Sequence, residues 1–267
     1  RKATIKISAE DNIDCPRYTC GLVTNVSVSP SPGWLQDRLI AAGQRPINNL
    51  VDISNFVLLE FGHPTHIFDY DKLDNKEIHV RRAKKNESIT TLDQNKYKLN
   101  NDHLLITDGK APIALAGIIG GLDSAVGADT KNILIESAYF NPVTIRKGSK
   151  ALSISTEASK RFERGADSEA ALDAFWRVVN LVEEHAGGIF EGDFIDYYPE
   201  KIKVNSIEIR KSELETILGL EIEDDFLIRV LNGLGFTVTD NNNGFNCIPP
   251  TNRPDITREI DIIEEIA

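Results

Sequence analysis

The sequence has no methionine, three cysteines and no apolar run that is long enough to cross a membrane. Its longest apolar runs, such as 113–119, have the length of a strand, whereas a membrane helix needs about 20 residues. Cys15, Cys20 and Cys247 cannot form a framework of disulfides, and the first two lack the second cysteine pair or nearby histidine that would complete a zinc site. We therefore expect free thiols in a reducing cytoplasm, and no membrane span.

The composition is otherwise that of a folded protein. Of the 267 residues, 41% are apolar and 27% are charged, a balance that supports a packed core and argues against disorder. The sequence begins with Arg1 and shows no basic segment followed by an apolar one, so no signal peptide is predicted. Because methionine is missing as well, we expect this chain to be part of a longer protein.

Negative charge is concentrated in the C-terminal part. The net charge is −11, of which residues 200–267 carry −7 and the remainder −4. Two basic clusters interrupt the first part, at 81–85 and at 145–164. A solvated surface is the ordinary explanation of such clusters, and a rim that binds phosphates is the functional one. The overall charge argues against nucleic-acid binding over the whole surface, but not at a local patch.

Hydrophobic periodicity and turn residues predict two domains of the α+β class. The expected elements of the first domain are a strand at 17–28, helices at 33–42, 47–60 and 168–185, a helix that begins at Pro142, a last strand at 188–199, and six strands between 77 and 140, one of which covers 112–120. We place the domain boundary at Pro199-Glu200. Residues 1–199 then form a β-rich domain with mixed or antiparallel sheets and flanking helices, and residues 200–267 form a small α+β domain.

No familiar enzyme motif is present. The glycines of 117–121 have neither the spacing of a dinucleotide-binding fingerprint nor the Lys-Ser/Thr pair of a phosphate-binding loop. The sequence also lacks the nucleophile elbow of hydrolases and the His-Glu-x-x-His of zinc proteases. These patterns alone therefore predict a two-domain α+β protein and leave its function open.

Several short segments, in the same order and spread along nearly the whole chain, resemble the beta chain of bacterial phenylalanyl-tRNA synthetase. They are 15–18 (CPRY), 45–52 (RPINNLVD), 62–69 (GHPTHIFD), 113–121 (IALAGIIGG), 132–140 (NILIESAYF), 156–159 (TEAS), 161–165 (RFERG) and 253–256 (RPDI). The resemblance implies the central editing module of that chain, followed by most of a small winged-helix-like domain.

The resemblance also implies partners and an activity. The family enzyme is an ATP-binding ligase of two alpha and two beta chains, and its alpha chain joins phenylalanine to tRNA(Phe) outside the module resembled here. That module hydrolyses tyrosine wrongly joined to tRNA(Phe). The need for it is physical, because a pocket for an apolar side chain rejects an analogue with one extra hydroxyl by only about 10²-fold. The alternative is a non-catalytic scaffold that binds tRNA or the alpha chain.

Glu136 is the centre of the predicted site. It shares one face of its predicted strand with Leu134, Ala138 and Phe140, because side chains alternate along a strand. An acid on an apolar face requires a polar partner; the ordinary explanation is an acid at an open strand edge. The resemblance implies that Glu136 accepts the hydroxyl of tyrosine. Phenylalanine would then leave the carboxylate unpaired, at a cost of about 1–3 kcal/mol.

The resemblance assigns five further residues to the same pocket. Gly120 gives the substrate ring room, Thr156 and Ala158 shape the pocket, and His66 and Asn55 lie near the ester, where they position the terminal adenosine or an attacking water. As ordinary explanations, Gly120 is a turn glycine, Thr156 and Ala158 begin a short helix, and His66 is a surface histidine on a loop. Nothing indicates a serine or cysteine nucleophile with a base behind it, so we expect direct attack by water.

A second group of candidates is acidic and lies near the end of the chain. Asp261, Glu264 and Glu265 share one face of a predicted helix, and Asp255 precedes it. Carboxylates that crowd together require a cation or a basic partner, and oxygen ligands suit Mg²⁺. The ordinary explanation is a solvated acidic face, and an acidic metal-binding interaction protein is the prediction without the resemblance. The resemblance implies a magnesium site shared with the alpha chain.

Overall fold

The structure is a computed structural model that describes residues 6–267; the first five residues of the predicted first domain lie outside this range. Contacts between residues divide the chain into a unit that ends at Lys201 and a second unit, Ile202–Ala267. The division falls two residues after the predicted boundary at Pro199-Glu200. In the described part of the chain, no helix is both long and apolar enough to pass through a bilayer.

The centre of the first unit is an antiparallel sheet in the order β11-β2-β10-β3. Its strands are β11 (Ile189–Tyr197), β2 (Arg17–Thr24), β10 (Ile133–Tyr139) and β3 (Thr65–Asp69). Side chains of β10 alternate between two cores: Ile133 and Ile135 belong to one, whereas Leu134 and Ala138 belong to the other. The predicted assignment of Leu134, Glu136 and Ala138 to one face is therefore confirmed.

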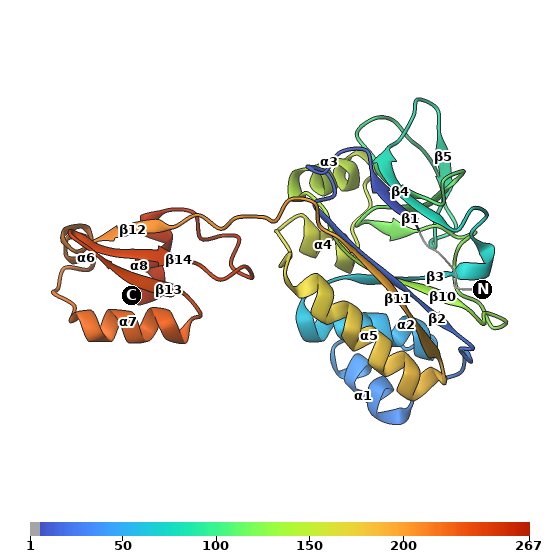
Figure 1. Cartoon of the computed structure of the whole chain (residues 1–267), viewed down its shortest axis with the longest axis horizontal. Coiled ribbons are helices and arrows are strands. Elements are labelled where there is room, and N and C mark those ends of the chain that lie inside the picture. Colours follow the sequence, from blue (N-terminus) through green and yellow to red (C-terminus); the bar gives the residue numbers. More distant parts are fainter. Residues whose placement is uncertain (1–5) are drawn as a thin grey trace. The chain divides into compact units, whose positions relative to one another are not determined.

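Three helices cover one side of this sheet (Figure 1). They are α1 (Gly33–Ala41), α2 (Asn49–Phe61) and α5 (Ala170–Ala186). The Asn48 side chain caps α2 by accepting a hydrogen bond from the Val51 N–H, and Gly62 ends that helix in the left-handed conformation with φ of 66°. These local signals explain why the sequence predicted the helix ends to within two residues.

On the other side lies a five-stranded sheet in the order β1-β4-β7-β8-β9, in which only the β1–β4 pair is parallel. Its strands are β1 (Lys6–Ala9), β4 (Glu77–Arg82), β7 (Leu104–Thr107), β8 (Pro112–Leu115) and β9 (Ile119–Gly120); β5 (Ser88–Thr90) pairs with β6 (Lys96–Lys98), and Tyr70–Lys72 form the 3₁₀ turn η1. The prediction of a single strand over 112–120 is wrong. Gly117, with φ of 65°, turns the chain between β8 and β9.

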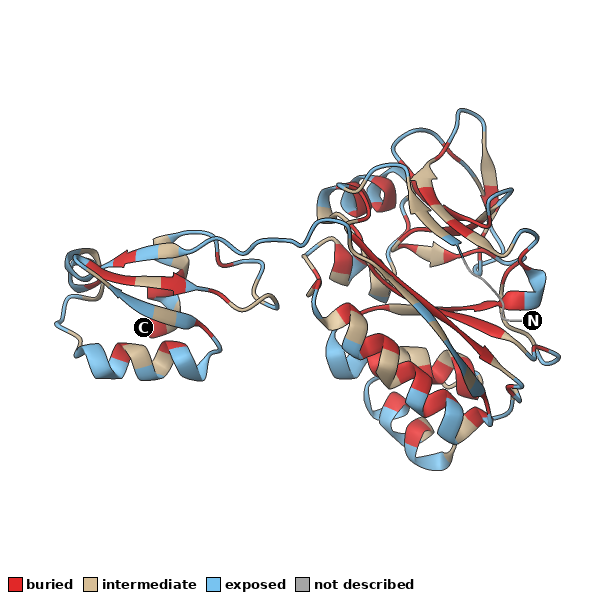
Figure 2. Cartoon of the chain, viewed as in Figure 1, coloured by how far each residue is buried: buried red, intermediate tan, exposed pale blue. Residues whose placement is uncertain are grey.

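Two further helices complete the first unit. They are α3 (Pro142–Leu152) and α4 (Glu157–Phe162). Asn141 accepts hydrogen bonds from the Val143 and Thr144 N–H groups, and Pro142 is the first helical residue, as predicted. Buried residues concentrate in the sheets and on the inner faces of the helices (Figure 2).

The second unit is a small α+β domain with a core of its own. Its elements are β12 (Ile207–Arg210), α6 (Lys211–Leu218), α7 (Asp224–Gly233), β13 (Thr237–Asn241), β14 (Gly244–Ile248) and α8 (Glu259–Ile266). The strands form an antiparallel sheet in the order β12-β14-β13. The predicted α+β class is confirmed for both units.

Candidate functional site

A cavity of about 490 Å³ lies in the first unit, bounded by α2, β3, the β8–β9 turn, β10 and the start of α4. Every predicted pocket residue lines it: Asn55, His66, Gly120, Glu136, Thr156 and Ala158. Most of the other lining residues are apolar. This size and lining are typical of pockets that bind small molecules, which measure about 300–1,000 Å³. The structure thus brings the candidates together, while the role of each stays a prediction.

Glu136 enters the cavity from the middle of β10 and is 6% exposed. It lies opposite Cys20 of β2 on one side and opposite His66 of β3 on the other. The hydroxyl of Tyr18 donates a hydrogen bond of 2.7 Å to Glu136 Oε2. Burial raises the pKa of the Glu136 carboxyl to about 7, although the hydrogen bond from Tyr18 acts in the other direction.

Tyr18 is the site residue that sequence reasoning missed. It pairs with Ala138, two residues along β10 from Glu136, so both side chains lie on the same face of the sheet. The two residues are 118 positions apart in the chain, and only their shared register brings them together. The expectation of an unpaired carboxylate requires a correction: one oxygen has a partner, and a phenylalanine ring would leave only Oε1 without one.

His66 belongs to strand β3, so the ordinary explanation, a surface histidine on a loop, does not hold. Its Nε2 is buried and has no hydrogen-bond partner among the described residues. Gly120 covers this face of the ring: a Cβ atom on Gly120 would lie 2.5 Å from His66 Cε1 and 2.8 Å from Nε2. Burial lowers the pKa of His66 to about 4, so the ring is neutral at pH 7. Gly120 is therefore a position of close approach between β9 and β3.

Thr156 is the N-cap of α4, as the ordinary explanation held. Its Oγ1 accepts a hydrogen bond from the Ser159 N–H at 3.0 Å and donates one to the Ile118 carbonyl at 2.7 Å. Because that donation uses the hydroxyl proton, Thr156 is not free to donate to a substrate in this conformation. Ala158 and Asn55 are both half-buried on the cavity wall, and their small or polar side chains leave the cavity open.

The cysteines do not supply a nucleophile. All three are free and buried. Burial and the nearby Glu136 carboxylate raise the pKa of both Cys15 and Cys20, so these thiols stay protonated. The cavity therefore contains no activated thiol, in keeping with the predicted attack by water.

The basic cluster next to α4 is partly neutralised within the chain. Lys160 and Arg161 both pair with Glu157, which also lines the cavity, and Arg146 donates to the Glu163 carbonyl. In the other basic cluster the two arginines are paired, since Arg81 binds Glu87 and Arg82 binds the buried Asp14, whereas Lys84 and Lys85 are exposed.
Lys147, Lys150 and Arg164 are exposed as well.

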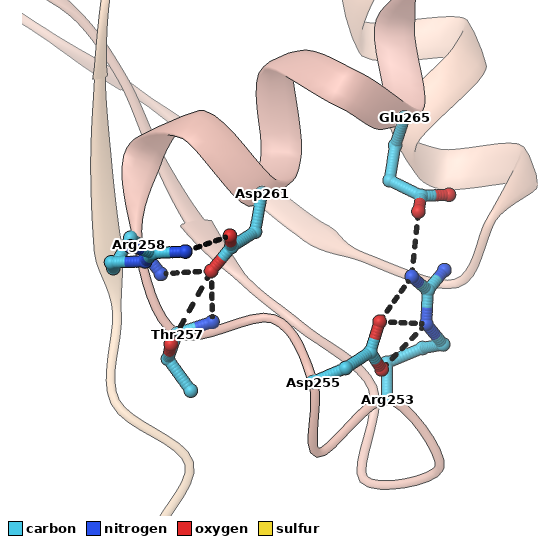
Figure 3. A network of polar contacts seen from close by, with 6 residues as sticks. All are labelled: Arg253, Asp255, Thr257, Arg258, Asp261 and Glu265. Atoms are coloured by element: carbon cyan, nitrogen blue, oxygen red, sulfur yellow. Dashed lines mark hydrogen bonds and ion pairs between the residues drawn. The ribbon is translucent and has the colours of Figure 1, made fainter.

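The four acidic candidates of the second unit do not converge on one point. Arg253 binds both Asp255, at 2.7 Å, and Glu265, at 2.6 Å. Asp261 forms a separate group in which it accepts from the Thr257 and Arg258 N–H groups at the start of α8 (Figure 3). Glu264 is exposed.

Within the described residues, no group of three or more histidine, cysteine or acidic side chains has the geometry to hold a metal. Arg253 neutralises Asp255 and Glu265, where the sequence pattern predicted a metal cation. As folded here, the carboxylates do not fit Mg²⁺, and a site shared with the alpha chain stays a prediction.

Comparisons with known proteins agree with the predicted resemblance. Residues 14–187 match the family model of the B3/4 domain, and residues 207–267 match that of the tRNA synthetase B5 domain. The phenylalanine–tRNA ligase beta subunit of Thermotoga maritima is 44% identical over 260 residues, which cover 97% of this chain and 33% of that protein. The same subunit of Bacillus subtilis is 44% identical over 263 residues, 98% of this chain and 33% of that protein. This chain thus spans about a third of the length of these relatives.

A crystal structure of an N-terminal fragment of the phenylalanyl-tRNA synthetase beta subunit from Pyrococcus horikoshii aligns with 98% of this chain and 73% of that chain, at 16% identity and a TM-score of 0.43. That similarity is too low to support an argument, so the assignment rests on the sequence matches. The B3/4 match covers more than half of the chain and contains every predicted pocket residue. The chain therefore belongs to the B3/4 domain family, matches the tRNA synthetase B5 domain in the segment after it, and resembles phenylalanine–tRNA ligase beta subunits over almost its whole length.

Proposed function

We propose that the first unit is the editing site of a phenylalanine–tRNA ligase beta subunit and hydrolyses tyrosine wrongly joined to tRNA(Phe). The observation that carries the proposal is Glu136, a buried carboxylate on an apolar cavity wall. One of its oxygens is bound by Tyr18, and the other has no hydrogen-bond partner among the described residues. A phenol that enters the cavity would supply that partner.

The free oxygen of Glu136 gives a physical basis for choosing tyrosine over phenylalanine. A phenylalanine ring fills the same apolar space but offers no donor. It would exclude water from Oε1 without replacing the lost hydrogen bond. An unsatisfied buried acceptor costs about 1–3 kcal/mol, and more when it is charged, which corresponds to a preference of about tenfold to a hundredfold. This preference runs in the direction that proofreading requires, since correctly joined phenylalanine must survive.

Hydrolysis itself requires little from the side chains of the cavity. An aminoacyl ester is already activated, and its neighbouring ribose hydroxyl can assist the attack of water. Burial lowers the pKa of His66 to about 4, which makes the ring a weak base, so it is better suited to holding a water or the adenosine than to removing a proton. We assign His66 and Asn55 to positioning and leave the attack to water.

The proposal is tested with the complete ligase, assembled with its alpha chain, and Tyr-tRNA(Phe) as substrate. We expect the parent to release tyrosine, and Glu136→Ala to lower the deacylation rate by about 10²-fold. Glu157→Gln is the matched control, because Glu157 also lines the cavity but is exposed and bound to Lys160 and Arg161. Equal rates for the parent and Glu136→Ala would contradict the role of Glu136, and no release by the parent would contradict the editing function itself.

The alternative is a scaffold that binds tRNA or the alpha chain without catalysis. It is favoured by the covered Nε2 of His66 and by the hydroxyl of Thr156, which is bound to Ile118. In that case the ligase would bind tRNA(Phe) as the parent does but release no tyrosine. Parallel measurements of binding and deacylation on the same preparation separate the two functions.

The partners follow from the same proposal. We propose an assembly of two alpha and two beta chains, in which the 3′ end of tRNA(Phe) enters the cavity and exposed Lys147, Lys150 and Arg164 contact its phosphates. The acidic second unit is a poor surface for nucleic acid, and we assign it to contacts with protein. Removing a lysine that contacts phosphate would weaken tRNA binding and reduce its salt dependence.

A further inference from the structure

We propose that Tyr18 is a positioning residue of this site: it occupies one oxygen of Glu136 permanently and presents the other to a single substrate phenol. The inference rests on the proposed function for the identity of the substrate, but its structural part stands on the geometry alone. Tyr18 is fully buried, and its hydroxyl lies 2.7 Å from Glu136 Oε2.

The sheet fixes this contact. Tyr18 pairs with Ala138 across β2 and β10, and Glu136 is two residues away on the same face. Diagonal neighbours at this spacing are within reach of a tyrosine side chain. Burial raises the pKa of the Tyr18 hydroxyl well above its usual value, so at neutral pH the group is always a donor. In its ionised form, Glu136 accepts this hydrogen bond at Oε2, which holds the carboxylate in one orientation.

Among residues 6–267, Tyr18 is the only group that donates a hydrogen bond to the Glu136 carboxyl. Those that face it or share its cavity are Tyr18 and Cys20 from β2, Cys15 before β2, His66 from β3, and Glu157 from α4. The two thiols remain protonated, the histidine is neutral, and Glu157 is paired with Lys160 and Arg161. Among the described residues, no cation contacts Glu136, so the phenol of Tyr18 is what favours the ionised form inside the apolar wall.

This arrangement sets how much recognition Glu136 can provide. With Tyr18 in place, the carboxylate has one open acceptor, which matches the one hydroxyl that distinguishes tyrosine from phenylalanine. Without Tyr18, both oxygens would be open, the carboxyl would take up a proton more readily, and its orientation would be free. Tyr18 therefore contributes to selectivity without touching the substrate.

The test is a ¹³C NMR titration of glutamate carboxyls in the full chain, with the Glu136 signal assigned as the one lost in Glu136→Gln. We expect Tyr18→Phe to raise the pKa of Glu136 by about one unit, since it removes a hydrogen bond to the charged form. Tyr139→Phe is the matched control, because Tyr139 lies three residues from Glu136 on β10, and the charged and phenolic groups that act on it are Asp167 and Tyr198 rather than Glu136. The pKa of Glu136 should be the same in Tyr139→Phe as in the parent.

A second readout needs no substitution at Tyr18. In the parent, labelled at the ζ carbons of tyrosine, the Tyr18 signal should shift as Glu136 titrates near pH 7. A Tyr18 signal that does not move in this range, or an unchanged Glu136 pKa in Tyr18→Phe, overturns the proposal.

A third readout connects the contact to editing. The pH profile of Tyr-tRNA(Phe) deacylation by the complete ligase should move in Tyr18→Phe by the same amount as the Glu136 pKa, and a profile that stays in place overturns the link. If the parent does not deacylate Tyr-tRNA(Phe), the proposed function fails, while the NMR titrations still decide whether Tyr18 holds Glu136.

Discussion

The carboxylate of β10 and the two at and just before α8 differ in what neutralises them. Glu136 is buried on an apolar sheet face, has one neutral donor, and its pKa is raised to about 7. Asp255 and Glu265 lie nearer the surface and share Arg253, whose hydrogen bonds lower the pKa of both. The single acid among apolar residues thus keeps one oxygen free to accept a hydrogen bond. In the acidic cluster, Asp255 and Glu265 are already bound to Arg253.

The comparison shows which kind of acidic pattern indicates a site. Clustering in sequence was the argument for magnesium, and the structure answers it with Arg253, Thr257 and Arg258. Isolation in an apolar strand was the argument for Glu136, and the structure places that residue on the wall of a cavity. Burying a charge without a charged partner lowers the stability of the fold. A carboxylate at such a position therefore indicates a role other than stability.

The largest expected effect is on the pH dependence of stability. Folding raises the pKa of Glu136 from about 4.5 to about 7, so the folded state binds the extra proton between these values. Stability is therefore lost as the pH rises through this window, and the loss is complete above pH 7. Glu136→Gln removes this contribution, and its stability relative to the parent should improve by about 3 kcal/mol between pH 4 and pH 8.

Chemical denaturation of the first unit at the two pH values measures this difference. His63 and His66, whose pKa values burial lowers to about 4, act with the opposite sign between pH 4 and pH 6.5. Both are present in either protein, so they cancel in the comparison. A relative stability that does not change with pH would show that Glu136 is not a desolvated acid.

The next effect tests the close approach at the pocket. A Cβ on Gly120 would lie 2.5 Å from His66 Cε1, so Gly120→Ala should destabilise the first unit by about 1–3 kcal/mol through overpacking. It should also reduce deacylation, because His66 must move. Gly127→Ala is the control, since a Cβ there meets no atom within 4 Å. Thermal unfolding of both variants checks the prediction, and equal melting temperatures would contradict it.

A smaller effect concerns selectivity and pH. Because the pKa of Glu136 is about 7, the carboxyl becomes mostly neutral as the pH falls from 8 to 6. The free-energy penalty of leaving a carboxyl without a hydrogen-bond partner is smaller when it is neutral. We therefore expect the preference for Tyr-tRNA(Phe) over Phe-tRNA(Phe) to fall by about tenfold over this range. Deacylation rates of the complete ligase, corrected for spontaneous hydrolysis, measure the ratio. A preference that rises on acidification would contradict this assignment of charge.

The smallest effect is expected at α8. Arg253→Ala removes two ion pairs that are partly exposed, and such pairs contribute about 1 kcal/mol or less. The loss of stability in the second unit should shrink further in 1 M salt, because salt screens the pairs. Arg258→Ala should cost less, since Asp261 keeps its backbone donors. A loss of several kcal/mol on removing Arg253 would show that the cluster is a buried network.

The fold could be predicted where the signals are local. Asn141-Pro142 began α3, and Gly62 and Gly187 ended α2 and α5, because each of these residues satisfies the helix end by itself. Strand β3 was missed because its five residues follow a proline and include only two large apolar side chains. It is a strand because β10 supplies its hydrogen bonds, and that pairing is not visible in the segment itself.

The residues that line the candidate site could be predicted from the sequence, but their contacts with one another could not. The resemblance located the cavity residues, and the alternation of β10 placed Glu136 on the correct face. The Tyr18 contact and the packing of Gly120 on His66 depend on how β2, β3 and β9 meet, which no spacing within one segment encodes. The use of the Thr156 hydroxyl by Ile118 is equally a property of the folded chain.

The most direct test of the account is a structure of the ligase with a non-hydrolysable tyrosyl-adenosine bound. We predict the phenol oxygen of the ligand within hydrogen-bonding distance of Glu136 Oε1, with Tyr18 still on Oε2. A ligand whose phenol points away from Glu136, or one that displaces Tyr18 to reach the carboxylate, would contradict it.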